Sequence, residues 1–343
     1  MRLTHTGMQE IETERLRLRK FVIEDANEIF REWANNENVT KYLTWERHKS
    51  AAQTKAWLLD VIAGYEQDNK YCWGIELKDT GGLIGSIGAN IIWEIARNAS
   101  VGYYLGERFW GYGYATEALR AVVDYLFYDV HVNRIEACHS INNPPSGRVM
   151  QKAGMLKEGR LRQEYITGGG EYQDCDLYGL VKEDFESLYK PEKSDFFDLE
   201  NKDLSKHTIR LVCYEYYPGN SEKKYVPGYK FNITEKSSGT VLGKIDLRLG
   251  FTEGLYYGGH IGYEVNAEYQ NMGIATVACK IVLQIAKAHG FKKIIITNNP
   301  ANKASARVCE KSGAKLVRVA KLPSWTEMYK EGDRYKNIYE VVL

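Results

Sequence analysis

The sequence predicts an α+β fold made of two tandem copies of one domain, and three observations carry this prediction. A strand-like run over residues 100–105, a glycine turn and an amphipathic helix follow one another directly in the first half. The same succession occurs in the second half, where an apolar run over residues 261–265 precedes another glycine turn and helix. The length of 343 residues is also sufficient for two domains of ordinary size.

Short blocks recur in the same order in both halves, which indicates an internal duplication. Aligning Gly273 with Gly111 gives an offset of 273 − 111 = 162, and aligning Asn302 with Asn143 gives 302 − 143 = 159. Two more pairs behave in the same way: residues 238–243 repeat residues 80–85, and residues 311–314 repeat residues 152–155. Four blocks in one order are hard to obtain by chance.

Apolar alternation predicts the strands of the first half, and apolar residues three to four positions apart predict its helices. The expected strands are 14–19, 71–77, 83–92, 100–105, 134–140, 164–166 and 175–181, and the expected helices are 25–33, 50–66, a long helix from the glycine turn to 128, and 146–152. Asp25 is expected to cap the first helix. Pro144 and Pro145 are expected to break the chain before the last helix, which Gly154 ends.

The two halves differ in the number of residues that precede the repeated hairpin. From Leu16 to Ile84 there are 84 − 16 = 68 residues, enough for two helices, whereas from Leu211 to Leu242 there are 242 − 211 = 31. Residues 217–228 contain two prolines and two glycines and cannot form two helices. We therefore expect a complete N-terminal domain over 1–185, a charged connector over 186–206, and a C-terminal domain over 207–343 without the helical pair.

Composition restricts the class of partner and the compartment. The formal net charge is +1, which gives no global reason to bind nucleic acid or an anionic membrane. Residues 1–10 are polar, and no apolar run approaches the roughly 20 residues of a membrane span, so no signal peptide or membrane anchor is expected. The six cysteines are scattered without a Cys-x-x-Cys pair, which predicts reduced thiols of a cytoplasmic protein and no metal site.

The first glycine turn has the properties of an anion site. Gly111 and Gly113 allow backbone conformations that other residues avoid and a close approach of the main chain to a ligand. The N–H groups of the turn and of the helix start then point to one place, which suits a phosphate or pyrophosphate. A tight turn without a ligand is the alternative. A dinucleotide site is less well supported, since the G-x-G-x-x-G spacing and an acid about 20 residues on are missing.

Together these blocks resemble the GCN5-related N-acetyltransferases. The R/Q-x-x-G-x-G/A signature of that family is matched from Arg108 to Gly113 and from Gln270 to Ala275, and its downstream Asn-x-x-Ser and Lys-x-Gly blocks are matched in both halves. The first half is also similar to the ribosomal-protein alanine acetyltransferase branch, in residues 14–19, 109–118 and 163–165. The resemblance covers nearly the whole chain, and it implies two domains, each with a mixed, mostly antiparallel sheet between helices in three layers.

The resemblance implies acetyl-coenzyme A as the acetyl donor, with its pyrophosphate on the glycine turn and its pantetheine arm between two diverging strands. In the first half it implies contacts from Leu105, Arg108, Phe109, Trp110, Gly111, Tyr112, Gly113, Tyr114, Ala115, Thr116, Asn143 and Ser146. In the second half the corresponding residues are Val265, Gln270, Asn271, Met272, Gly273, Ile274, Ala275, Thr276 and Asn302.

Acetyl transfer to an amine needs a base for the amine proton, a donor to the thioester oxygen and a proton for the departing thiolate. The resemblance assigns Glu164 as the base, acting directly or through water, and Ser146 as the acid. The alternatives are a solvated strand glutamate and a serine that caps a helix. Many family members carry a tyrosine acid shortly after this serine, but Val149 and Met150 stand there in this chain.

We therefore expect an N-acetyltransferase with its main active site in the first half, because the helical pair that walls the acceptor is kept only there. Glu264 and Ser305 are weaker catalytic candidates in the second half, which is alternatively a coenzyme A-binding or interface module. A ligand-binding protein without catalysis is the remaining alternative. The acceptor is left open between a protein amine and a small-molecule amine, since acceptor loops vary freely on such scaffolds. Trp45 falls in the loop that would frame it.

Overall fold

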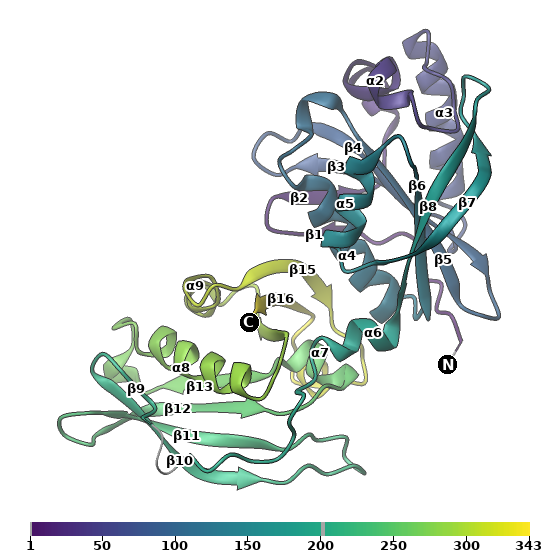
Figure 1. Cartoon of the computed structure of the whole chain (residues 1–343). Helices are drawn as coiled ribbons and strands as arrows, with labels where there is room; N and C mark the ends of the chain where they lie inside the picture. The colour runs from purple at the N-terminus through teal and green to yellow at the C-terminus, as the bar shows by residue number, and fades with distance from the viewer. Residues whose placement is uncertain (1, 200–202) are drawn as a thin grey trace. The chain divides into compact units, whose positions relative to one another are not determined.

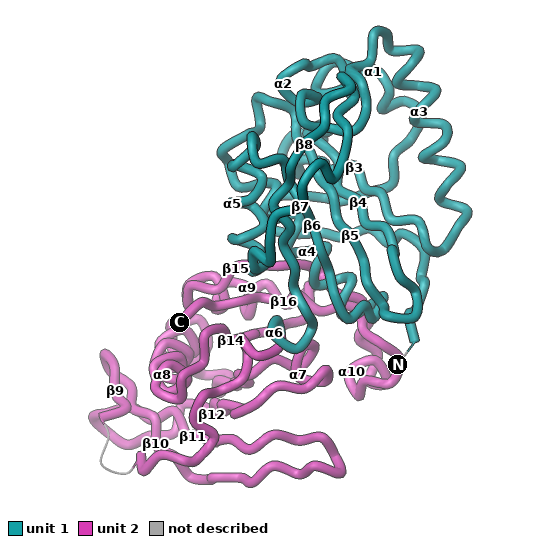
Figure 2. The backbone as a smooth tube through the Cα atoms, turned by 45° about the vertical axis from the view of Figure 1, so that its right-hand side comes forward, with its two compact units in different colours: residues 1–185 teal, residues 186–343 magenta. Residues whose placement is uncertain are grey.

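The computed structural model describes residues 2–199 and 203–343 of the chain (Figure 1). It divides into two compact units, Met1–Phe185 and Glu186–Leu343 (Figure 2). Both units pack helices against β-sheets, and the tandem α+β architecture predicted from the sequence is confirmed.

Unit 1 follows the predicted order of elements. Its strands are β1 (Ile11–Glu12), β2 (Leu16–Arg19), β3 (Tyr71–Leu77), β4 (Leu83–Trp93), β5 (Asn98–Leu105), β6 (Arg134–Ser140), β7 (Leu156–Ile166) and β8 (Tyr172–Val181). Its helices are α1 (Ala26–Ile29), α2 (Glu37–Thr40), α3 (Ala51–Gly64), α4 (Tyr114–Tyr128) and α5 (Pro144–Lys152), with 3-10 turns at Ile23–Asp25 and Glu107–Phe109 and a π-helical turn at Phe30–Ala34. The boundary between the units falls within α6 (Lys182–Ser187).

The eight strands of unit 1 form one sheet in the order β1-β2-β3-β4-β5-β6-β8-β7. Neighbours are antiparallel except β5 and β6, which pair in parallel only from Asn98 with Arg134 to Ser100 with Glu136. Beyond Ser100 the two strands are no longer paired, although β5 continues to Leu105. The end of β5 therefore has no strand neighbour on that side, directly before the glycine turn.

Helices cover both faces of this sheet. The apolar side of α4, which includes Leu119 and Leu126, is completely buried. On the other face, Trp33 and Leu58 from the helical segment form a core with Leu83 of β4. Figure 2 shows α3 and α5 on opposite sides of the sheet. Unit 1 is therefore a three-layer arrangement.

Two local expectations for unit 1 are wrong. Asp25 stands at the N-cap of α1, but its carboxylate makes no capping hydrogen bond because it accepts from Arg19, and the segment over 25–33 is not one α-helix. Pro144 and Pro145 do not precede α5 but form its first turn. A helix leaves the first N–H groups unpaired, so the missing N–H of proline costs nothing there.

Unit 2 repeats the order of elements without the helical segment. Its strands are β9 (Ser205–Lys206), β10 (Ile209–Tyr217), β11 (Gly228–Glu235), β12 (Val241–Arg248), β13 (Ile261–Val265), β14 (Lys293–Asn298), β15 (Lys315–Lys321) and β16 (Tyr335–Val342). Its helices are α7 (Glu253–Gly258), α8 (Ile274–Ala288), α9 (Lys303–Lys311) and α10 (Glu327–Lys330), with a 3-10 turn at Ala267–Tyr269. The strands form two antiparallel sheets, β13-β12-β11-β10-β9 and β14-β16-β15.

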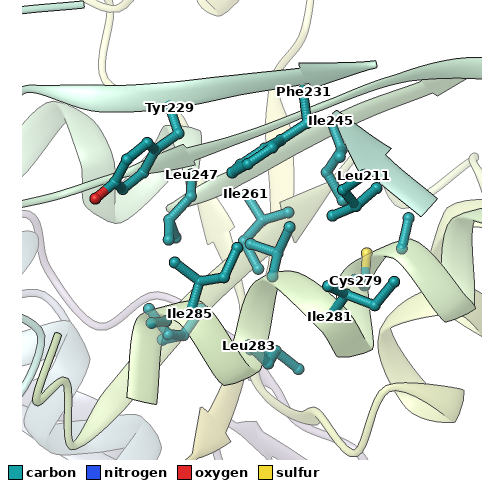
Figure 3. Packing of buried hydrophobic residues seen from close by; sticks show 14 of the residues in the cluster. Leu211, Tyr229, Phe231, Ile245, Leu247, Ile261, Cys279, Ile281, Leu283 and Ile285 are labelled. Carbon is teal, nitrogen blue, oxygen red and sulfur yellow. The ribbon is translucent and has the colours of Figure 1, made fainter. Parts of the chain in front are cut away.

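The core of unit 2 lies between the five-stranded sheet and α8. Figure 3 shows strand side chains such as Phe231 and Leu247 on one side and Ile281 and Ile285 of α8 facing them. All four side chains are buried. This is the same strand-on-helix packing that β5 and α4 have in unit 1.

The other face of the five-stranded sheet carries no helix in the part of the chain that is described (Figure 1). Residues 218–227, which stand where unit 1 has its helical segment, form a loop closed by a bridge between Asn220 and Tyr225. On this open face Val212 and Tyr214 are 41% and 46% exposed. The second half thus keeps two of the three layers.

Residues 186–199, at the start of unit 2, pack against the rest of that unit through two buried histidines. Nδ1 of His289 donates to the Lys193 carbonyl oxygen at 2.7 Å, and the His289 ring stacks on Phe197 with centroids 4.0 Å apart. Nε2 of His260 donates to the carbonyl oxygen of Tyr189 at 3.1 Å. This part of the charge-rich connector therefore contributes to the interior of unit 2.

Candidate active site

The glycine turn between β5 and α4 has the backbone that an anion cradle requires. Gly111 and Gly113 have φ angles of 85° and 83°, in the left-handed region that residues with a Cβ avoid. In the described structure, the main-chain amides of residues 111–116 donate to no other protein group. Unpaired amides at the positive end of a helix such as α4 are suited to a phosphate or pyrophosphate.

The second turn repeats this backbone, but in a register other than the predicted one. Gly273, directly before α8, has φ 79° and ψ 2°, against 83° and 2° for Gly113 directly before α4. Asn271 takes the position of Gly111, with a φ of 62°. The offset is therefore 273 − 113 = 160, close to the other blocks, and the alignment of Gly273 with Gly111 is wrong.

The corrected register changes the first residue of the signature. Trp110, not Arg108, is the counterpart of Gln270. Trp110 donates from Nε1 to the Leu105 carbonyl oxygen at 2.9 Å, and Gln270 donates from Nε2 to the Val265 carbonyl oxygen at 3.0 Å. Each side chain fixes the end of the strand before its turn. The family signature also fits when it is started at Arg108. This fit arises only because an arginine stands two residues before Trp110, the true counterpart of Gln270.

Arg108 and Glu107 attach the first turn to the helical segment instead. Nε of Arg108 lies 2.7 Å from a carboxylate oxygen of Glu32, whose side chain is 5% exposed. Glu107 accepts hydrogen bonds from the side-chain amides of Asn36 and Asn38 at 3.0 and 2.9 Å, and these bonds lower its pKa. The sequence analysis missed these partners, because no local pattern connects residues so far apart.

A pocket of about 660 Å³ opens between the end of β5, the glycine turn and the start of α5. Of the predicted residues, it is lined by Leu105, Phe109, Trp110, Gly111, Gly113, Tyr114, Ala115, Thr116, Asn143 and Ser146. Arg108, Tyr112 and Glu164 do not line it. Lys41, Arg148 and Lys152 add positive charge to its wall, which suits a ligand that carries phosphates.

Ser146 is the third residue of α5 and lines the pocket. Asn143 is the N-cap of this helix, so the alternative role of Ser146 as the cap is wrong. The carbonyl oxygen and Oγ of Ser146 lie 2.8 and 3.1 Å from the hydroxyl of Tyr103 in β5. The sequence analysis missed Tyr103, although the Gly-Tyr pair recurs at 262–263 and could have indicated it.

Glu164 lies beside the pocket rather than in it. The pairing of β7 with β8 is interrupted between Leu161 and Tyr165, and Glu164 sits in the resulting bulge with an exposed side chain. The hydroxyl of Tyr165 donates to the carbonyl oxygen of Tyr42 at 3.2 Å, and Tyr42 lines the pocket. Glu164 is therefore one residue away from a contact with the pocket wall.

The loop between α2 and α3 is packed against the hairpin that carries this bulge. The Gly168 amide donates to the Leu43 carbonyl oxygen at 2.9 Å, and a Cβ on Gly168 would come within 2.3 Å of the Trp45 main chain. The Trp45 ring packs edge-on against Tyr104, with centroids 5.7 Å apart. Leu43 and Tyr104 line the pocket, so Trp45 lies directly behind its wall.

The second half has no counterpart of the bulge with Glu164. β15 and β7 share an earlier irregularity, after Leu316 and Lys157 respectively, at an offset of 316 − 157 = 159. Beyond it, β15 stays paired with β16 to its end at Lys321. Without the extra residues of the bulge, β15 has no residue at the position of Glu164.

The two asparagines expected to face the pantetheine arm also differ. The side chain of Asn143 makes no capping hydrogen bond, and the residue lines the pocket. The side-chain oxygen of Asn302 accepts from the Ser305 amide at 3.0 Å and so caps α9. In unit 2 this side chain is already engaged by its own helix.

Residues 2–199 and 203–343 lack two features. No helix there combines the length and the apolar character needed to cross a membrane. No three His, Cys, Asp or Glu side chains there are grouped as they would be around a metal ion.

Comparison with known proteins gives a family match in each half and relatives that cover about half of the chain. A family model described as an acetyltransferase (GNAT) domain matches residues 15–156 and 178–315. The uncharacterized N-acetyltransferase YoaA of Bacillus subtilis (strain 168) is 37% identical over 172 residues, which are 50% of this chain and 96% of that protein. The [ribosomal protein uS5]-alanine N-acetyltransferase of Escherichia coli (strain K12) is 27% identical over 179 residues, 50% of this chain and 91% of that protein. A solved GNAT-family acetyltransferase from Bacillus anthracis is 27% identical, with a TM-score of 0.45 over 51% of this chain and 99% of its own.

The two matches of the family model together cover most of the chain and agree with the internal duplication. The family resemblance and the acetyl donor expected from it are therefore confirmed. The free amides of the turn and the basic wall of the pocket are suited to the phosphates of that donor. The chain belongs to the GNAT acetyltransferases, as an acetyl-coenzyme A-dependent N-acetyltransferase with two tandem GNAT domains.

Proposed function

We propose that unit 1 transfers the acetyl group to a primary amine by direct attack of the amine on the thioester. One observation carries this assignment: the glycine turn and Ser146 line the same pocket, and the bulge with Glu164 adjoins it. β15 of the second half lacks the bulge that carries Glu164, which supports unit 1 as the place of reaction.

Each residue of unit 1 has a distinct part in this proposal. Acetyl-coenzyme A supplies an activated acetyl group when it is bound. The amides of residues 111–116 hold the pyrophosphate. Glu164 accepts the proton of the amine through water, because its side chain is exposed beside the pocket. Ser146 holds a proton at Oγ for the departing sulfur. Tyr42 and Tyr104 wall the pocket and limit the access of water.

We propose a protein amine as the acceptor, with a small-molecule amine as the alternative. The name of the Escherichia coli relative gives an alanine of ribosomal protein uS5 as its acceptor, which supports a protein amine. We also place the reaction in the cytoplasm. All six cysteines are free thiols, in keeping with a reducing compartment.

For unit 2 we propose binding of coenzyme A without turnover. The backbone angles at Gly273 match those at Gly113, and the amides of residues 271–276 likewise donate to no described protein group. The open sheet face gives an amine no wall to bind against. Unit 2 would then hold the nucleotide as a second, non-catalytic site.

The two glycines before the helices provide a matched test. Gly113→Val and Gly273→Val each place a β-branched residue at a left-handed φ, 83° and 79° respectively, which such a residue disfavours. At neither position does an added Cβ meet a close neighbour. Calorimetry with acetyl-coenzyme A should give two binding events for the wild type and one for each variant. Thiol release with a panel of peptides and amines should be lost only in Gly113→Val. Loss in Gly273→Val alone would move the reaction to unit 2, and no heat with the wild type would refute the proposal.

A further inference from the structure

The hydrogen bonds around Ser146 contain a residue that the reaction described above does not use. The Tyr103 hydroxyl donates to the carbonyl oxygen of Ser146 at 2.8 Å, and it lies 3.1 Å from Oγ of the same residue. A tyrosine hydroxyl has one proton and two lone pairs. While its proton is on the carbonyl oxygen, Tyr103 can accept the hydroxyl proton of Ser146. Tyr103 therefore determines where the proton of Ser146 points.

The second half shows the other arrangement of the same two groups. Tyr263 lies 2.7 Å from Oγ of Ser305 and 3.5 Å from its carbonyl oxygen. The carbonyl bond is thus the shorter one in unit 1, and the hydroxyl contact is the shorter one in unit 2. A small rotation is enough to move a tyrosine proton between two oxygens of one serine. The Tyr-Ser pair is kept in both copies.

We propose that Tyr103 is a positioning residue for the proton that Ser146 gives to the departing sulfur. This rests on the function proposed for unit 1. As the C–N bond forms and the C–S bond breaks, the electron pair of the C–S bond goes to sulfur and Ser146 gives sulfur its proton. Tyr103 then turns its own proton from the carbonyl oxygen to Oγ and stabilises the oxygen that Ser146 leaves negative. The proton that Glu164 took from the amine passes to solvent, and solvent returns one to Ser146.

Burial supports this division of roles. Tyr103 lines the pocket, and its hydroxyl reaches Ser146 of α5. Burial of this hydroxyl raises its pKa above the ordinary value for tyrosine. Tyr103 therefore stays protonated wherever the enzyme works. It can donate a hydrogen bond to Ser146 at every stage.

The test is a set of four full-length variants assayed for thiol release: Tyr103→Phe, Ser146→Ala, the double variant, and Tyr263→Phe as the matched control in unit 2. Tyr103→Phe should lower kcat about ten-fold and leave the KM for acetyl-coenzyme A unchanged, since only one hydrogen bond to the acid is lost. The double variant should be no slower than Ser146→Ala, because Tyr103 acts only through that residue. Tyr263→Phe should retain the wild-type kcat.

Three results would overturn the inference: a kcat for Tyr103→Phe within two-fold of the wild type, losses that multiply in the double variant, or a loss confined to KM. Thermal unfolding of all four variants separates these results from misfolding, and Phe keeps the shape of the ring. A wild type that releases no thiol with any amine would instead refute the proposed function. The two failures are therefore distinguishable.

Discussion

The two halves share a glycine turn and differ in what lies on the sheet beside it. In unit 1 the cross-strand pair of Ser86 and Tyr104 is covered by the segment that carries Trp45. In unit 2 the same place holds Lys244 paired with Glu264, and both are exposed. Covering a charged side chain with a helix costs free energy unless the charge is paired. The second sheet is therefore adapted to water and not merely missing a wall.

This difference separates what the main chain does from what side chains do. The turn needs only two left-handed residues before a helix, and Asn271 with Gly273 supplies them as well as two glycines do. The base and the acceptor wall need particular side chains, and these differ between the copies. A duplicated domain can thus keep the geometry of a nucleotide site after its chemistry has changed.

The largest expected effect lies at the bulge that only unit 1 carries. Glu164→Gln removes the proposed proton acceptor and should lower kcat about 1,000-fold with an unchanged KM for acetyl-coenzyme A. Thiol release under saturating donor measures it. Glu171→Gln, at the exposed tip of the same hairpin, is the control and should keep the wild-type rate. Undiminished turnover in Glu164→Gln would remove this residue from the base role.

The covered and open sheet faces should also differ in stability. Leu58, which is completely buried over the sheet of unit 1, should cost about 3 kcal/mol when replaced by Ala. Val212→Ala on the open face of unit 2 should cost less than about 1 kcal/mol, because that side chain is 41% exposed. Denaturant unfolding of both variants measures the difference. Equal losses would mean that the second face is covered in solution.

Low pH should lower the stability of unit 2, because unit 2 contains a buried histidine that unit 1 lacks. His260 stands where unit 1 has Ser100, and it accepts from the Ile295 amide at 3.1 Å while donating to Tyr189. Burial, with a contribution from Arg248, lowers the pKa of His260 to about 4 from the ordinary 6.5.

The unfolded chain takes up this proton more readily than the folded one, so stability falls as the pH drops from 6.5 towards 4. The loss should reach about 2 kcal/mol by pH 5. Unfolding curves at several pH values, compared between the wild type and His260→Asn, isolate this contribution from that of the carboxylates. Parallel pH profiles for the two proteins would contradict the assignment.

The smallest expected effect concerns the attachment of the turn in unit 1. Glu32→Gln weakens the ion pair with Arg108 and should lower stability by about 1 kcal/mol, since the arginine is well exposed. Glu268→Gln is the control: Glu268 stands at the position of Arg108 in unit 2 and is exposed. Calorimetric unfolding compares the two variants. A loss in Glu268→Gln as large as in Glu32→Gln would contradict a role specific to unit 1.

Local patterns predicted most of the fold of unit 1. The bounds of β3 and β6 and the end of α4 agree with the expected ranges, because alternation and helical periodicity are set by neighbours in the sequence. The register of the second glycine turn was not predicted correctly. Spacing alone matched Arg108 to Gln270, whereas the place of Gly113 and Gly273 directly before their helices decides the alignment.

The site was predictable only in part. The turn, Asn143 and Ser146 meet in one pocket as the family resemblance implied, and Glu164 lies outside it on a bulge. That bulge depends on how β7 pairs with β8, which no property of residues 162–164 alone specifies. The repeated Gly-Tyr pair could have indicated Tyr103, but its contact with Ser146 joins residues 43 positions apart and depends on the fold.

The arm at residues 186–199 has a practical consequence. Its composition marks it as the natural place to cut the protein in two, yet its main chain supplies the acceptors for both interior imidazoles of the second domain. A fragment that starts near residue 207 would leave those two rings without their carbonyl partners and Tyr229 without the aromatic side chain packed on it. Separation of the two domains with both intact should therefore be made at Phe185, and the arm should remain with the C-terminal piece.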